Sequence, residues 1–245
     1  MLSIRKLGVI SRTYRNLSRY RQILMILLKY GFGDLLVLLR LDQYVEAGLQ
    51  RIIKKQPVHV EKLSRPQGLR MALEELGPTY IKLGQILSTR PDLIPVDFIN
   101  ELTKLQDKVP PFPFSAVRKI IEKELNAPLE EIFDAFTETP LASASIGQVH
   151  KARLRDGQEV AVKVQRPGIQ RIIEVDLEIL LHLATLMERH IEELALHRPV
   201  KIVEEFARTL EKELDYNLEA ANMERIALNC AGDRYTRIPR LYRDV

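Results

Sequence analysis

Residues 141–165 read LASASIGQVHKARLRDGQEVAVKVQ, and this stretch decides the fold. Asp156-Gly157 stands between two runs of strand-like composition, which is a strong signal for a β-hairpin with strands at 148–154 and 159–165. Side chains alternate between the two faces of a strand, so Lys163 shares a face with Ala161, and the other face carries Val160, Val162 and Val164. The sequence therefore predicts a rigid hairpin with a lysine in the middle of its second strand.

The spacing of this stretch resembles the nucleotide-binding part of protein kinases, in which a G-x-G-x-x-G-x-V loop precedes a V-A-I-K strand. The loop positions hold Ala142, Ala144, Gly147 and Val149, and the strand reads Val160-Ala161-Val162-Lys163. A flat ligand fits against the small Ala161 while the ammonium group of Lys163 reaches its phosphates. The alternative is an ordinary hairpin with an exposed lysine and a serine-rich loop, and the joint spacing of loop and strand disfavours it.

The composition is that of a folded protein, with 245 residues of which 46% are hydrophobic and 29% charged. The single cysteine, Cys230, excludes an internal disulfide and a cysteine-based metal cage, and it fits a reducing compartment. We interpret each histidine as a surface residue or a satisfied helix residue, because no metal-ligand spacing connects His59, His150, His182, His190 and His197. No metal site is expected in this chain.

Positive charge is concentrated at the N-terminus, although the net charge is only +4. No acidic residue precedes Asp34, whereas the same segment contains Arg5, Lys6, Arg12, Arg15, Arg19, Arg21 and Lys29. Residues 1–60 have a helical pattern, and the apolar run 23–28 is too short to span a bilayer. Three interpretations remain open: helices packed on the domain with a solvated basic face, an amphipathic helix on an anionic membrane surface, or an organellar transit peptide. Nucleic-acid binding is disfavoured because the overall charge is low.

Outside the hairpin the chain is predicted to be largely helical. The expected helices cover 69–76, 79–89, 96–107, 116–125 (with Ser115 as N-cap), 129–136, 169–191 and 200–229, and a further strand is expected to begin within 237–245. In helix 79–89, Lys82 and Gln85 share a face, and Gly84 costs about 1 kcal/mol relative to alanine. Such a glycine indicates close approach of a backbone or a ligand. Taken alone, a surface lysine and glutamine beside an incidental glycine is the better interpretation.

Helix 200–229 also carries an acidic cluster. Asp215 and Glu219 are four residues apart, so a helix would place both carboxylates on one face, which is unfavourable unless a cation is near. Lys163 is the natural cation, because a kinase anchors its strand lysine with a helix glutamate. The alternative is a solvated acidic face that includes Glu211 and Glu213.

Together these features resemble the UbiB family of atypical protein-kinase-like proteins, which are linked to ubiquinone biosynthesis in bacteria and organelles. The similarity extends from about Leu69 onward and rests on a KxGQ motif (82–85), an Ala-rich loop (142–148), the strand lysine Lys163, and an ExD motif (213–215) followed by Glu219. It implies an α+β fold, in which a helical KxGQ-type N-terminal extension packs on an incomplete kinase-like small lobe of antiparallel sheet and one αC-like helix. The expected domains are basic N-terminal helices at 1–60, a helical KxGQ domain at 61–126, and the truncated small lobe at 127–245.

The resemblance also implies roles for individual residues. Lys163 and Glu219 would be the catalytic pair, and the nucleotide would contact Ala142, Ser143, Ala144, Ser145, Ile146, Gly147, Val149, Ala161 and Lys163. Ser143 replaces an alanine found in many relatives. From the helical domain, Lys82 and Gln85 would cover the active site and meet Glu213 and Asp215, an arrangement associated in this family with blocking protein substrates. The cofactor would be ATP or ADP with Mg, and the reaction would be ATP hydrolysis or small-molecule or lipid-linked phosphoryl transfer.

The 245 residues contain no H-R-D-like catalytic loop, metal-binding asparagine or D-F-G motif. They are therefore expected to be catalytically incomplete as given, either as a fragment of a longer protein or as a truncated reading frame.

The expected location is cytoplasmic and peripheral to a membrane in bacteria, or organellar if the N-terminus is a transit peptide. The expected partners are nucleotide, an anionic membrane surface or isoprenoid lipid bound by the basic N-terminus, and quinone-biosynthesis proteins, without nucleic acid. The alternative function is a non-catalytic, kinase-like regulatory or lipid-binding scaffold at a membrane surface.

Overall fold

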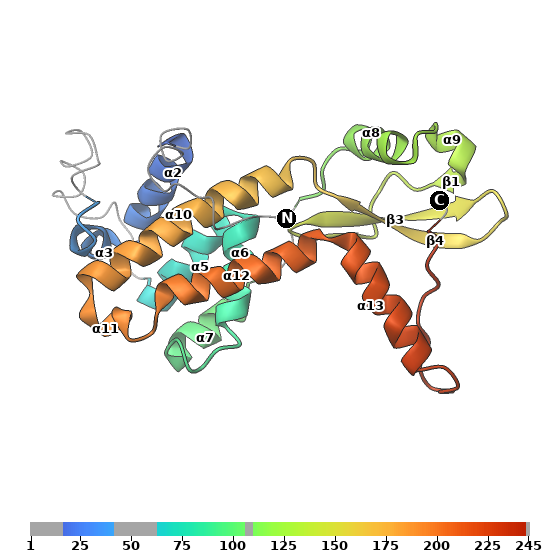
Figure 1. The fold of residues 1–245 in the computed structure, drawn as a ribbon. Coiled ribbons are helices and arrows are strands. Elements are labelled where there is room, and N and C mark those ends of the chain that lie inside the picture. The colour runs from blue at the N-terminus through green and yellow to red at the C-terminus, as the bar shows by residue number, and fades with distance from the viewer. Residues whose placement is uncertain (1–16, 42–62, 106–109, 244–245) are drawn as a thin grey trace. The chain divides into compact units, whose positions relative to one another are not determined.

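A computed structural model describes residues 17–41, 63–105 and 110–243 (Figure 1). The chain divides into two compact units, each made of segments that are far apart in the sequence. Unit 1 combines residues 1–107 with 170–207, and unit 2 combines residues 108–169 with 208–245. The three sequence domains expected at 1–60, 61–126 and 127–245 remain a prediction.

Unit 1 is helical in its described part. Its helices are α2 (Leu17–Lys29), α3 (Gly33–Leu38), α5 (Arg65–Leu76), α6 (Pro78–Leu87), α7 (Val96–Leu102), α10 (Ile169–His190), α11 (Glu192–Ala195) and the larger part of α12 (Pro199–Leu214). One buried cluster joins α2, α3, α5, α6, α7 and α10, and it includes Ile23, Leu36, Leu73, Tyr80, Leu102 and Ile179. Helix α2 is therefore part of the core, as the first of the three interpretations expects. Residues 1–16 and 42–62 lie outside the described residues.

Arg19 fixes α2 to this unit. Its Nε and Nη2 donate to the two carboxylate oxygens of Asp176 at 2.8 and 3.1 Å, and Nη2 also donates to the carbonyl oxygen of Leu76 at 2.6 Å. Because Asp176 is only 1% exposed, the ion pair ties α2 to α5 and α10 where little water competes.

The junction between α5 and α6 follows directly from its sequence. Ser64 and Gln67 form a reciprocal capping box at the start of α5. Gly77, with φ of +99°, ends α5, and Pro78 begins α6 at the position where its missing N–H costs least. This local chemistry places the KxGQ segment on α6.

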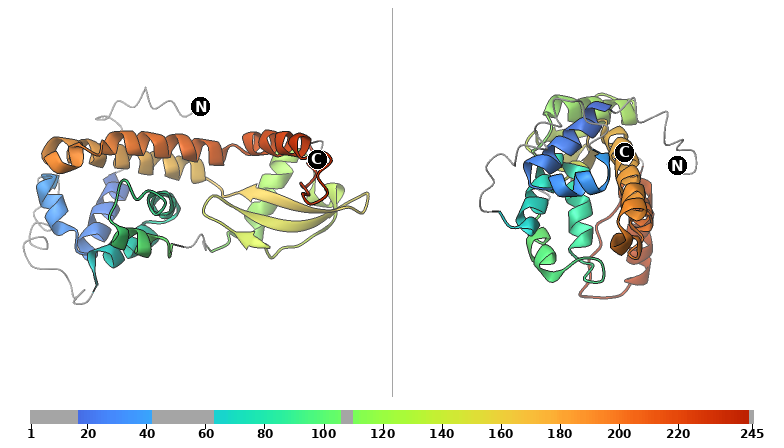
Figure 2. Two further views of the ribbon diagram at one scale, coloured as in Figure 1. Left: turned by 90° about the horizontal axis from the view of Figure 1, so that it is seen from below. Right: turned by 90° about the vertical axis from the view of Figure 1, so that its left-hand side faces the viewer.

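Unit 2 is built on a four-stranded antiparallel sheet of β1 (Phe133–Phe136), β2 (Ala142–Ser143), β3 (Gly147–Leu154) and β4 (Glu159–Gln165). Strand β3 pairs with each of the other three strands. The hairpin of β3 and β4 is the one expected from Asp156-Gly157, and its two strands run side by side in Figure 2. Figure 1 shows α8 (Phe114–Leu125) and α13 (Tyr216–Asn229) on opposite sides of this sheet, and the short helix α9 (Leu129–Ile132) leads into β1.

The valine face of the hairpin is the buried face. Val164 and the half-buried Val160 and Val162 pack with a cluster that includes Val117 and Ile121 of α8 and Phe133, Ala152 and Leu154 of the neighbouring strands. Lys163 lies on the opposite face, as the alternation predicts. The α+β class, with a helical part and a small antiparallel sheet carrying helices, is confirmed.

Two expected helices are wrong in ways that matter for the site. The helix expected at 200–229 is broken at Asp215, which has extended backbone angles and separates α12 from α13. The helix expected at 129–136 ends at Ile132, because Phe133–Phe136 pairs with β3 instead. Both corrections come from contacts that are distant in sequence or from capping, which helical periodicity does not detect.

Smaller differences concern element ends. Helix α8 begins at Phe114 after Pro113, so Ser115 is not its N-cap. Helix α7 ends at Leu102 rather than at 107. The strand expected within 237–245 is absent from the described residues, which extend to 243. Among the described helices, none combines the length and the apolar character needed to cross a bilayer.

Candidate functional site

Three predicted site residues form one row across the sheet of unit 2. Ala142 of β2 lies opposite Val149 of β3, which in turn lies opposite Lys163 of β4. Ala161 shares this face two residues before Lys163, and both alanines are exposed. The structure thus brings the predicted small side chains and the lysine together as an apolar strip beside a positive charge.

Glu219 of α13 pairs with the lysine of this row. Its Oε2 lies 2.6 Å from Nζ of Lys163, which is the pair expected from the sequence. Both side chains are about half exposed, at 44% and 48%. Such an exposed pair is worth about 0–1 kcal/mol of stability, so its main effect is to orient the lysine.

Asp215 has a different structural role from the one that helix spacing predicts. It is the N-cap of α13, and its Oδ1 accepts hydrogen bonds from the backbone N–H groups of Asn217 and Leu218 at 3.0 and 3.1 Å. The expectation that Asp215 and Glu219 stack on one helix face is therefore wrong. Glu213, the other acidic residue of the ExD motif, lies in the last turn of α12.

Tyr216 is a residue of this site that the sequence analysis missed. Nζ of Lys163 lies 4.6 Å from the centre of its ring, within the range of a cation–π interaction. Its hydroxyl is buried and has no hydrogen-bond partner among the described residues, and burial, with a smaller effect of the Glu219 charge, raises the pKa of Tyr216 to about 12. The available signal was its position three residues before Glu219, which puts both side chains on one face of a helix.

The Ala-rich loop is a closed turn at the end of this row. The N–H of Ala144 donates to the carbonyl oxygen of Gly147 at 2.8 Å, and the N–H of Arg166 donates to that of Ile146, also at 2.8 Å. Ser145 and Ile146 are buried, and the buried Oγ of Ser143 has no hydrogen-bond partner in the part of the chain that the structure describes. Two backbone hydrogen bonds thus fix the loop, one within the turn and one to Arg166.

Buried hydrogen bonds on the opposite face of the sheet anchor the end of the same loop. Gln148 exchanges two hydrogen bonds with the backbone of Phe112, and its Nε2 lies 2.9 Å from Nε2 of His150. Nδ1 of His150 lies 2.8 Å from the carbonyl oxygen of Thr137, so Nδ1–H donates there while Nε2 accepts from Gln148. The interpretation of His150 as a surface or helix residue is therefore wrong: it is a fully buried strand residue.

Arg166 makes further contacts with the same proline-rich connector, which is residues 110–113 (PPFP). Its Nη2 donates to the carbonyl oxygen of Pro110 at 2.9 Å, and its guanidinium lies 5.3 Å from the ring centre of Phe112. Burial lowers the pKa of Arg166. The connector is thus fastened to the start of β3 through Gln148 and to the end of β4 through Arg166.

The KxGQ segment lies in unit 1, on α6. The close approach expected at Gly84 is present, and it is made by side chains: an added Cβ would overlap Leu105 and lie 2.7 Å from Leu73. Nε2 of Gln85 donates to the carbonyl oxygen of Leu105 at 3.4 Å. The role of Lys82 and Gln85 over an active site stays a prediction.

The chemistry of the Lys163 face suits a nucleotide. An aromatic base can lie on the alanines, an ammonium group is available for phosphate, and the hydroxyl of Ser143 lies in the adjoining loop. The described part of the chain contains no group of three or more His, Cys, Asp or Glu side chains that could hold a metal ion.

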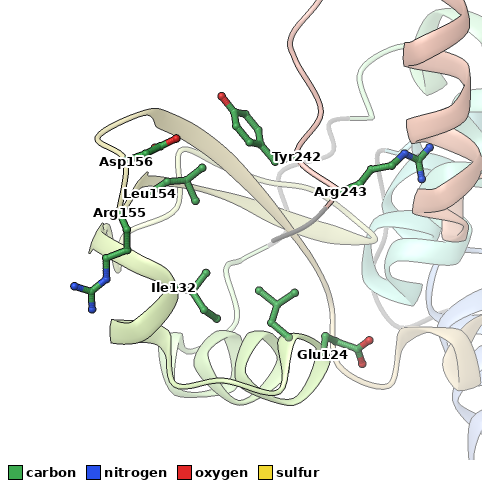
Figure 3. A pocket seen from close by; sticks show the side chains of 8 residues that line it. Glu124, Ile132, Leu154, Arg155, Asp156, Tyr242 and Arg243 are labelled. Atoms are coloured by element: carbon green, nitrogen blue, oxygen red, sulfur yellow. The ribbon is translucent and has the colours of Figure 1, made fainter.

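A separate pocket of about 610 Å³ opens on the other side of the sheet (Figure 3). It is lined by Glu124, Leu125, Ile132, Leu154, Arg155, Asp156, Tyr242 and Arg243. Its two arginines are already engaged, Arg243 with Glu224 at 2.7 Å and Arg155 with the carbonyl oxygen of Glu130. The pocket contains none of the predicted site residues.

Comparison with known proteins identifies similar sequences over most of this chain. The family model described as the ABC1 atypical kinase-like domain matches residues 104–245. Three curated proteins named "Probable protein kinase UbiB" are 43% identical over 235 residues (Aeromonas salmonicida), 48% over 178 (Marinobacter nauticus) and 48% over 183 (Pseudomonas aeruginosa). The alignments cover 94%, 73% and 75% of this chain, but 42%, 32% and 34% of these relatives, so the chain spans less than half of their length.

One solved structure is also similar in sequence. Rv3197 from Mycobacterium tuberculosis, determined in complex with erythromycin, is 37% identical with a TM-score of 0.42. The match covers 66% of this chain and 41% of that chain.

Proposed function

Because this chain belongs to the UbiB family of ABC1-type atypical kinase-like proteins, we propose that it binds ATP or ADP on the Lys163 face of unit 2 and serves an atypical kinase or ATPase that supports ubiquinone biosynthesis. The observation that carries the proposal is the contact of Lys163 with Glu219 beside the row of Ala142 and Val149. Protein kinases use the same combination of strand lysine, helix glutamate and overlying loop for ATP.

Each side chain has a defined part in this proposal. The ammonium of Lys163 binds the phosphate oxygens, and Glu219 holds the ammonium in place. The base lies on Ala142, Val149 and Ala161, while the loop of Ser143, Ala144, Ser145, Ile146 and Gly147 covers the phosphates. Mg²⁺ bound with the nucleotide would neutralise phosphate charge.

The reaction is ATP hydrolysis or phosphoryl transfer to a small molecule or lipid. In this proposal the KxGQ residues Lys82 and Gln85 and the ExD residues Glu213 and Asp215 serve to exclude protein substrates. Asp215 combines this with its capping of α13. The partners are proteins of quinone biosynthesis, and the chain acts at the cytoplasmic or organellar side of a membrane.

Calorimetric titration of the 245-residue chain with ATP and ADP, with and without Mg²⁺, tests the proposal. Binding should weaken in Glu219→Gln, because the lysine loses its anchor. Glu224→Gln is the matched control, since Glu224 lies on the same helix and pairs with Arg243 instead. Absence of any heat of binding at millimolar nucleotide would contradict the proposal.

The link to quinones has its own test. The gene that encodes the chain is introduced into a bacterium that lacks its UbiB protein, and ubiquinone is measured by mass spectrometry. The proposal expects restored ubiquinone with the wild-type gene and none with Lys163→Met. Equal restoration by both would separate the quinone role from nucleotide binding.

A non-catalytic, lipid-binding scaffold is the second candidate. It is favoured by the lack of a metal-binding cluster in the described residues and by the basic N-terminus. Deleting the N-terminal segment as a whole would be a poor test, because α2 belongs to the core of unit 1. Flotation with anionic liposomes should therefore compare the wild type with a variant in which Arg5, Lys6, Arg12 and Arg15 become glutamine. Undiminished flotation would argue against a membrane role of this segment.

A further inference from the structure

We infer that Tyr216 is a positioning residue that holds the ammonium group of Lys163 for the nucleotide. The inference rests on the proposed nucleotide binding at Lys163. Two side chains of one turn of α13 would then fix the lysine, Glu219 through an ion pair and Tyr216 through the face of its ring. Neither contact alone sets the position of a flexible lysine side chain.

The distances place both Glu219 and Tyr216 in contact with the ammonium group of Lys163. Nζ of Lys163 is 2.6 Å from Oε2 of Glu219 and 4.6 Å from the ring centre of Tyr216. Positions 216 and 219 are three apart on α13, so their side chains lie on the same face of the helix. The electron-rich face of an aromatic ring attracts a cation, and it does so without the competing negative charge of a second carboxylate.

The hydroxyl of Tyr216 also contacts the Ala-rich loop. It has no hydrogen-bond partner within the described part of the chain, and an ideal Cβ at Gly147 would lie 2.5 Å from it, so it rests directly against Gly147, where the loop meets β3. With a pKa of about 12, the phenol is neutral at physiological pH, and the ring acts through its π face and its shape. Tyr216 therefore contacts both Lys163 and the end of the loop. A shift of α13 would change both of these contacts.

The first test observes the lysine itself and requires no nucleotide. Lysines of the full 245-residue chain are reductively methylated with ¹³C, and the Lys163 signal is assigned by its loss in Lys163→Arg. The ring current of Tyr216 should shift this signal upfield, the shift should persist in Tyr216→Phe and it should disappear in Tyr216→Leu. An unchanged signal in Tyr216→Leu would overturn the inference. If Tyr216→Leu does not fold, the wild-type chain decides: an NOE between the Lys163 methyl groups and the Tyr216 ring is expected, and its absence overturns the inference.

The second test measures the consequence for binding. Tyr216→Leu should weaken ADP binding about threefold, the size expected for one exposed cation–π contact. Tyr216→Phe should bind as the wild type does, and so should Tyr235→Leu, a matched change at an exposed tyrosine. Equal ADP affinity in Tyr216→Leu and the wild type would overturn the positioning role. If the wild type itself does not bind ADP, the proposed function fails, whereas the NMR result still decides whether Tyr216 positions Lys163.

Discussion

The hydroxyl of Tyr216 occupies the space that a side chain at Gly147 would need. An ideal Cβ at this glycine would lie 2.5 Å from that hydroxyl and 2.6 Å from the carbonyl oxygen of Val164. Its backbone angle is not in the left-handed region, so conformational freedom is not the reason for glycine here. The third glycine of the kinase-like pattern is therefore required by the close approach of Tyr216 of α13 and of the Val164 carbonyl of β4, independently of any phosphate.

Gly147→Ala should lower the free energy of unfolding by about 1–3 kcal/mol, because the added methyl group overpacks this contact. Urea denaturation monitored by circular dichroism measures the change. Gly33→Ala is a suitable control, since its added methyl group would meet Leu28 at an ordinary 3.4 Å. The double variant Gly147→Ala/Tyr216→Phe should recover only part of the loss, because the Val164 carbonyl remains; no recovery would show that the hydroxyl does not contribute.

Asp215→Ala should destabilise the chain by about 0.5–2 kcal/mol, because α13 loses its N-cap. Asp215→Asn should cost much less, since an amide oxygen accepts the same two backbone hydrogen bonds. Thermal unfolding of both variants measures the difference. If the asparagine variant is as unstable as the alanine variant, the negative charge and not the cap is what the structure needs.

Arg19→Leu should destabilise unit 1 by about 3 kcal/mol, because it leaves the buried carboxylate of Asp176 without its counter-charge. A second replacement, Asp176→Leu, in the same chain should restore much of the stability by removing the unpaired charge. The comparison is made by chemical denaturation. A double variant as unstable as Arg19→Leu would mean that packing, and not the charge, is responsible.

The stability of unit 1 should fall as the pH is lowered below about 6.5, the ordinary pKa of histidine. Burial, together with the charge of Arg189, lowers the pKa of His182 in the folded chain. The unfolded chain then takes up a proton at a higher pH than the folded chain does, so acid favours unfolding between the two pKa values. The melting temperature between pH 7.5 and 5.5 should depend less on pH in His182→Gln than in the wild type and in His190→Gln; identical pH profiles for all three would contradict this assignment.

The hairpin could be predicted from the sequence because its signals are local. Asp156-Gly157 and the alternation of valines fix the turn, the ends of β4 and the face of Lys163 without any distant contact. The pairing of Lys163 with Glu219 is distant in sequence, and its prediction came from the family pattern rather than from periodicity.

The remaining features depend on contacts that no local pattern encodes. The apolar periodicity of 200–229 continues through Asp215, so the break at the cap was invisible to it. Phe133–Phe136 is equally apolar as a helix end and as a strand, and only pairing with β3 decides between the two. The hydrogen bonds of Gln148 to Phe112 and of His150 to Thr137 join residues that are 36 and 13 positions apart.

Titration of the chain with ADP in Lys163→Met and in Lys151→Met tests the central claim most directly. Lys151 is a matched control, because it is on the same face of the hairpin and pairs with Glu159 at 2.8 Å. The account predicts that Lys163→Met loses at least about tenfold in affinity, as expected when one charge-assisted contact to phosphate is removed, while Lys151→Met binds as the wild type does. Equal affinity of Lys163→Met and the wild type would contradict it.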